Sequence, residues 1–193
     1  MNRVTARLGQ TRWWLPTLFS LLTFGAFVIL FQLEGRFEVL TGVPVFDTQN
    51  DLTPAALMQQ LPLYQGRALE AYHAFAAFDY LLPLIAGLFQ VFLLAFLLRS
   101  LTWDTGRTLI RLGLPLLPLL GTLSDWLENT ALLSILAAAP QPAAWLVDAA
   151  ILFKRMKLIF LFSGTSLVLL LAVALVVNRG LAILRRRRVM VVL

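Results

Sequence analysis

Long apolar segments alternate with short polar segments along most of this chain. Four of the apolar segments are long enough to cross a bilayer as a helix, because a hydrocarbon core of about 30 Å requires about 20 residues. They cover residues 13–33, 72–98, 112–136 and 158–177. The pattern therefore predicts an all-α protein, a four-span transmembrane helix bundle that forms a single membrane domain over residues 1–193.

The only long connection runs between the first two segments, over residues 34–70. It contains glycine, proline, asparagine and aspartate, which favour turns. Within it, Thr53 precedes Pro54, and a threonine cap followed by proline is a typical helix start. We expect a short surface helix from Pro54 to Leu61 inside this first loop.

The composition supports a membrane location, because 60% of the residues are hydrophobic, 13% are charged and the mean hydropathy is +0.83. The absence of cysteine excludes disulfides, thiolate nucleophiles and cysteine-ligated metals. The net charge of +6 comes mainly from basic residues beside the spans, including the tail 179–193. Anionic membrane lipids are the expected partner of these bases, and nucleic acid is not expected.

The basic residues also predict the orientation, since arginine and lysine favour cytoplasmic flanks. Arginines precede the first segment, lie between the second and third, and follow the fourth. The loop 34–70 is mostly acidic. Both termini are thus expected to be cytoplasmic and the first loop extracytoplasmic. Lys154, Arg155 and Lys157 depart from this pattern, because they fall at the outer end of the fourth segment.

Acidic residues inside the spans account for this departure. Asp79, Asp125 and Glu128 interrupt the second and third segments, and a rise of 1.5 Å per residue brings them to the same height as Lys154 and Lys157. Charged side chains that face lipid are costly to insert, so these groups should meet inside the bundle. Lys157 is expected to contact at least one of the acids.

Such a cluster has two interpretations. It could be a dry ion-pair network that only holds the helices together, or the wall of a pocket open to the extracytoplasmic side, in which Glu128 would be partly hydrated. We favour the pocket, since Pro83 should free the carbonyl of Asp79 from helical hydrogen bonding. The candidate ligand-binding or cluster residues are Arg67, Tyr72, His73, Asp79, Asp125, Glu128, Asn129, Lys154 and Lys157.

Catalytic chemistry is left open by the sequence. His73 is the single histidine, which excludes a di-haem cytochrome, and no zinc-protease spacing surrounds it. It could act as a base with Ser124, Ser163 or Thr165 as nucleophile, although nothing nearby selects one of them. No metal site and no cofactor are expected.

The polar positions resemble a pattern in uncharacterised bacterial four-helix integral membrane proteins. The resemblance rests on Gly66-Arg67-x4-Tyr72, Asp79-x3-Pro83, Asp125-x2-Glu128-Asn129 and Lys157. It implies a multi-pass protein of the bacterial inner (plasma) membrane and suggests that these positions belong together. It implies no function.

Three functional classes fit these expectations. The first is binding or handling of a small polar or amphipathic, lipid-like ligand, with Arg67, Lys154 and Lys157 attracting its anionic part and the acids ordering these bases or taking a cationic part. The second is a membrane-embedded lipid hydrolase or transferase that uses a carboxylate as general acid/base. The third is a non-catalytic accessory subunit that docks a membrane partner protein or a second copy of the chain.

The orientation can be tested by cysteine labelling, since the chain has no cysteine of its own. A cysteine at Asn50 should react with a membrane-impermeant maleimide in intact cells, because the first loop is expected to be extracytoplasmic. Labelling that occurs only after lysis would contradict this prediction and place the first loop in the cytoplasm.

Overall fold

The computed structural model describes residues 3–101 and 104–191, with side chains through residue 180. The described part of the chain is helical and contains no strand, so the all-α prediction is confirmed. The α-helices are α1 (Arg3–Leu8), α2 (Trp14–Thr41), α3 (Pro54–Gln60), α4 (Gly66–Asp79), α5 (Leu82–Ser100), α6 (Asp104–Arg111), α7 (Pro118–Ala137) and α8 (Ala144–Val191). Short 3-10 helices are η1 (Phe46–Thr48), η2 (Leu61–Leu63) and η3 (Leu114–Leu116).

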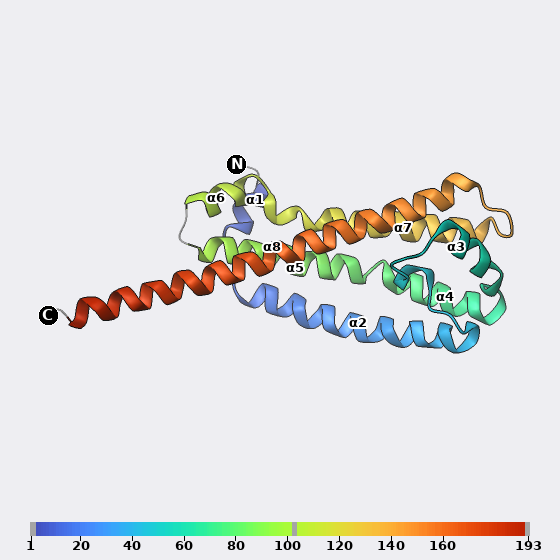
Figure 1. Ribbon diagram of the computed structural model, residues 1–193, viewed down its shortest axis with the longest axis horizontal. Coiled ribbons are helices and arrows are strands. Elements are labelled where there is room, and N and C mark those ends of the chain that lie inside the picture. The colour runs from blue at the N-terminus through green and yellow to red at the C-terminus, as the bar shows by residue number, and fades with distance from the viewer. Residues whose placement is uncertain (1–2, 102–103, 192–193) are drawn as a thin grey trace.

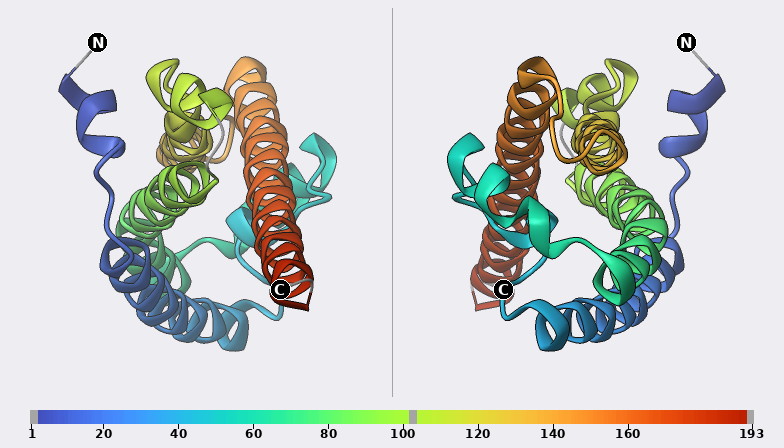
Figure 2. Two further views of the ribbon diagram at one scale, coloured as in Figure 1. Left: turned by 90° about the vertical axis from the view of Figure 1, so that its left-hand side faces the viewer. Right: turned by 90° about the vertical axis from the view of Figure 1, so that its right-hand side faces the viewer.

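The long helices α2, α5, α7 and α8 run side by side along an elongated bundle (Figure 1). Viewed along the bundle they form an open arc, with α2 at one end and α8 at the other (Figure 2). α2 packs against α4 and α5, whereas α8 packs against α7 and α5. α1 and α6 lie at one end of the bundle, where α8 extends beyond it, and α3 lies at the opposite end (Figure 1).

The described residues contain three helices that are long and apolar enough to cross a membrane: Trp14–Thr41, the broken helix Gly66–Ser100, and Ala144–Gly180. Their outward faces are strongly apolar, with Phe24 70% and Val176 71% exposed. Such continuous apolar surface is costly in water and suits lipid. These helices support the prediction that the chain is a membrane protein. α7 packs among them but carries polar residues and is not one of the three.

Several helix boundaries differ from the predicted ones. α2 continues past Leu33 to Thr41 and ends where Gly42 adopts a left-handed conformation, with φ 75°. α4 already begins at Gly66, so the connection between the two helices is shorter than 34–70. The predicted third segment divides into η3 and α7, because α7 starts only at Pro118. Lys154, Arg155 and Lys157 lie within α8, which includes 48 residues, rather than before its first turn.

The connection between α2 and α4 folds back into the end of the bundle. Val45, Phe46 and Leu57 are completely buried there. Phe46 stacks on Tyr64 with ring centroids 4.2 Å apart, and its backbone N–H donates to the Tyr64 hydroxyl at 2.9 Å. Within this connection, α3 starts at the Thr53 cap, whose hydroxyl accepts from the backbone N–H of Ala56. The connection is therefore a packed structural element and places η1 against the interior of the bundle.

A break between α4 and α5 interrupts the second apolar helix. Pro83 has no N–H to offer the carbonyl of Asp79, so the regular hydrogen-bond ladder stops there. Two side chains of α7 supply replacements: the Trp126 indole donates to the Tyr80 carbonyl at 2.8 Å, and the Asn129 amide donates to the Asp79 carbonyl at 3.4 Å. The sequence predicted one continuous span over 72–98 with a freed Asp79 carbonyl; the structure instead has a break there, which the polar stretch of α7 stabilises.

Close contact between α5 and α7 at Gly87 gives a test of this packing. A Cβ at Gly87 would overlap the hydroxyl of Thr122, which donates to the Pro83 carbonyl at 2.8 Å. We expect Gly87→Ala to lower the free energy of unfolding by about 1–3 kcal/mol through overpacking. Gly25→Ala is the matched control, because a Cβ at Gly25 has nothing within 4 Å. Equal unfolding curves for the two variants in detergent would contradict this packing.

Candidate functional site

Glu128 of α7 lies at the centre of the charged residues. Its side chain is completely buried, and its two carboxylate oxygens lie 2.7 Å from Lys154 Nζ and 2.7 Å from Lys157 Nζ. Both contacts are ion pairs outside normal hydrogen-bond angles, and within the described part of the chain these oxygens have no hydrogen-bond donor. Lys157 also donates to Asp125 Oδ1 at 3.0 Å. The contact expected for Lys157 is therefore present, and it joins α7 to α8.

This arrangement follows from helical spacing. Asp125 and Glu128 are three residues apart on α7, as are Lys154 and Lys157 on α8. Residues three apart share a helix face, so two adjacent pairs can meet where the helices pack. The acids and the bases therefore align along one seam between α7 and α8.

Lys154 is buried and is held by three oxygen atoms. Besides Glu128, its ammonium group donates to the backbone carbonyls of Phe46 at 3.0 Å and Asp47 at 2.9 Å. Two of its three N–H groups are thus used in hydrogen bonds, and its charge is paired with that of Glu128. Lys154 thus fixes η1 to α8 and is not free to bind a ligand. Arg155, the neighbouring base, is exposed and makes no ion pair in the described structure.

Asp47 belongs to this site although sequence reasoning treated it as a turn residue. It is 6% exposed, and its Oδ2 accepts a hydrogen bond from the Tyr72 hydroxyl at 3.0 Å. Its other oxygen, Oδ1, is buried without a hydrogen-bond partner. Burial, reinforced by the nearby Glu128 carboxylate, raises the pKa of Asp47 to about 6. Burial thus makes the ionised form of Asp47 less favourable than that of a solvated aspartate.

Asp79 lies at the end of α4, beside the helix break. It is 6% exposed, and its Oδ2 accepts from the Asn129 amide at 3.1 Å. No lysine or arginine of the described residues comes within ion-pair distance of Asp79 or Asp47. Both carboxylates are held by neutral donors, which stabilise an ionised carboxylate less than an ammonium group does.

A cavity of about 390 Å³ adjoins these residues. Its polar wall includes Asp47, Asp79, Asp125 and Lys157. Residues of α4, α5 and α7 also line it, and α2 and α8 contribute the apolar side chains of Phe27, Leu30, Leu158, Phe160 and Leu161. α2 and α8 have little direct contact with each other, so the cavity lies at the open side of the arc seen in Figure 2. Its volume is within the range of about 300–1,000 Å³ that is usual for small-molecule pockets.

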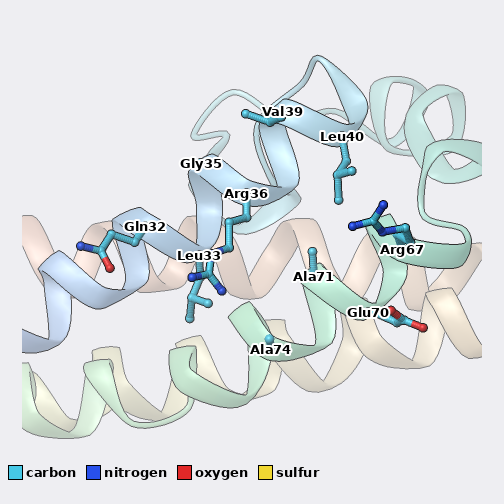
Figure 3. A pocket seen from close by; sticks show the side chains of 10 residues that line it. All are labelled: Gln32, Leu33, Gly35, Arg36, Val39, Leu40, Arg67, Glu70, Ala71 and Ala74. Atoms are coloured by element: carbon cyan, nitrogen blue, oxygen red, sulfur yellow. The ribbon is translucent and has the colours of Figure 1, made fainter.

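Two expected site residues lie elsewhere. Arg67, in the first turn of α4, is exposed and lines a separate open groove of about 740 Å³ against the end of α2 (Figure 3). Arg36 of α2 lines the same groove, and neither arginine has an ion pair among the described residues. Arg67 lies outside the cluster because α4 begins at Gly66, which places this residue beside α2 rather than α8. His73 is exposed and is not among the residues that line the cavity.

The expected hydration of Glu128 is wrong, since this side chain is 0% exposed and does not line the cavity. The carboxylates that line the cavity are instead those of Asp47, Asp79 and Asp125. The nucleophile hypothesis gains no geometry either: Ser124 donates to the Leu120 carbonyl at 2.8 Å, and the described residues show no hydrogen bond from His73 to a serine or threonine. Within the same residues, no group of three or more histidine, aspartate or glutamate side chains is placed to hold a metal ion.

Protein-family models, curated proteins and solved structures give no match to this chain. The geometry of the cavity and its charges is accordingly the basis for any functional conclusion.

The shared ion pairs can be tested by a double-mutant cycle. Lys157→Met should lower the free energy of unfolding by about 3–5 kcal/mol, because it leaves Asp125 buried without an ionic partner. Adding Asp125→Leu removes the stranded charge and should restore most of the stability. Reversible unfolding in detergent provides the measurement. Arg155→Met, which changes an exposed base on the same helix, is the matched control and should have little effect. A harmless Lys157→Met would contradict the ion-pair assignment.

Proposed function

We propose that this protein is a four-span protein of the bacterial inner membrane that binds or handles a small polar or amphipathic, lipid-like ligand in the cavity beside Asp79 and Lys157. In this proposal α7 is the fourth span, both termini are cytoplasmic, and the connection that contains η1 covers the cavity from the extracytoplasmic side. The ion pairs would then lie within the outer part of the bilayer.

The observation that carries the proposal is the two-sided lining of the cavity. Charged groups form one part of the lining, and apolar side chains of α2, α4, α5 and α8 form much of the rest. An amphiphile has the matching division, with a polar head and an apolar chain. A purely structural ion-pair network would not require a cavity of about 390 Å³ beside it.

The separation of α2 from α8 supports access from the lipid. Those two helices contribute five apolar residues to the lining, so a chain that lies between them would remain in an apolar environment. The head would reach Asp47, Asp79 and Lys157 without crossing the packed interface of α7 and α8. In this proposal η1 covers the head-group site on its extracytoplasmic side.

An accessory subunit is the second candidate, favoured by the exposed apolar face of α8. Ile159 is 62% exposed and Phe162 is 65% exposed on that helix. This surface could equally face lipid, whereas the cavity has no role in a docking function. A lipid hydrolase or transferase could use a cavity carboxylate as general acid/base, but no hydrogen-bonded nucleophile supports this alternative among the described residues.

The proposal is tested by filling the cavity. Ala86 of α5 lines it, so Ala86→Phe should occupy part of its volume and reduce a co-purifying amphiphile at least severalfold in native mass spectrometry. Ala77→Phe places the same side chain at an exposed position of α4 outside the cavity and should leave retention unchanged.

Thermal unfolding of both variants shows whether the fold survives. Equal retention by two folded variants would contradict binding in this cavity. If the parent protein retains no amphiphile and instead co-purifies with a stoichiometric membrane protein, the accessory-subunit alternative replaces the proposal.

A further inference from the structure

The charges around the cavity do not balance. The described residues bring together four carboxylates, those of Asp47, Asp79, Asp125 and Glu128, with two ammonium groups, those of Lys154 and Lys157. When all six groups are ionised, two negative charges remain. The excess is local, because the chain as a whole has a net charge of +6.

The ion pairs locate this excess. Lys154 and Lys157 are both engaged with Glu128, and Lys157 also binds Asp125. Asp47 and Asp79 have no ion-pair partner among the described residues and receive hydrogen bonds only from neutral groups. When all the groups are ionised, the uncompensated charge therefore lies on these two aspartates, and both line the cavity.

Free acceptor atoms accompany this charge. Asp47 Oδ1 is buried, in a residue that is only 6% exposed, and has no hydrogen-bond partner. Asp79 accepts its side-chain hydrogen bond through Oδ2, and no donor among the described residues bonds to its Oδ1. A buried acceptor without a donor is costly, so an occupant that supplies N–H groups would stabilise this arrangement.

We infer that the cavity binds the protonated amine of an amphiphile, with Asp47 and Asp79 as the residues that recognise it. This inference rests on the proposed function and specifies its ligand class. An ammonium group supplies both the positive charge that would pair with the aspartates and the N–H donors that their free oxygens could accept. The apolar residues between α2 and α8 take the hydrocarbon chain.

The alternative polarity is less compatible with the contacts. An anionic head would need a free base, but Lys154 is buried, paired with Glu128 and bound to two carbonyls, and Arg67 lies in another groove. Lys157 would be the available base, and it is already shared by two carboxylates. A bare divalent cation is also less suitable, since no group of three or more metal-binding side chains is found in the described residues. An organic ammonium group needs fewer protein ligands.

The test compares two probes that differ in head-group charge. The full chain in dodecyl maltoside micelles is titrated with dodecylammonium or with dodecyl phosphate, and native mass spectrometry counts the bound molecules. We expect saturable retention of one dodecylammonium per chain and weaker retention of dodecyl phosphate. Nonspecific attraction to a chain of net charge +6 would favour the phosphate, so the expected preference cannot arise from net charge.

Isosteric variants then assign the preference to the cavity. Asp79→Asn and Asp47→Asn should each weaken dodecylammonium binding by about tenfold or more, because each removes one charge-assisted interaction. Asp148→Asn removes an exposed carboxylate outside the cavity and should have no effect. Thermal unfolding identifies variants that fold, and Asp79→Asn suffices for the assignment if Asp47→Asn does not fold.

The outcomes separate the inference from the proposed function. Saturable binding of dodecyl phosphate in preference to dodecylammonium, lost in Ala86→Phe, would overturn the amine inference and retain the lipid-like ligand. Equal dodecylammonium binding by the parent and a folded Asp79→Asn variant would also overturn the inference alone. Failure of both probes to saturate, with no native amphiphile retained, would overturn both proposals.

Discussion

The burial of Glu128 between two lysines is the constraint on which the arrangement of this bundle depends. A carboxylate without solvent needs ionic partners, and here Lys154 and Lys157 supply one to each oxygen. This sharing fixes the register of α7 against α8, because a shift of either helix by one turn would separate the charges. It also recruits the backbone of η1, since the ammonium group of Lys154 is completed by two carbonyls from that segment. Replacing a single member therefore affects both helices and the connection that covers them.

The same stretch of α7 also stabilises an irregular segment of its neighbour. Trp126 and Asn129 donate to carbonyls at the break between α4 and α5, while Glu128 faces the lysines of α8. Irregular backbone within a membrane protein is tolerated where other protein groups satisfy it. The break places Asp79 at the cavity wall, since α4 ends at that residue. The polar side chains of α7 thus bind both the break between α4 and α5 and the lysines of α8.

Much of this organisation could be predicted from the sequence, because hydropathy identifies long apolar helices and charge inside such helices demands a partner. The pairing of Lys157 followed from spacing along α7 and α8. Asp47 could not be found in this way, since it lies in a turn-rich connection where an aspartate is normally solvated. Its burial depends on the aromatic packing around Phe46 and Tyr64, which is a tertiary contact without a local signal. Arg67 was misplaced for the related reason that the start of α4 was not evident.

The length of α8 has a mechanical consequence. A continuous helix of 48 residues is about 72 Å long at 1.5 Å per residue, more than twice the thickness of a bilayer core of about 30 Å. Lys154 and Lys157 lie near its beginning, and the helix extends beyond the opposite end of the bundle (Figure 1). Because a helix transmits tilt along its axis, a small rotation about the ion pairs becomes a much larger displacement at the far end. The packing of α8 along the seam with α7 would therefore determine where its far end lies relative to the bundle.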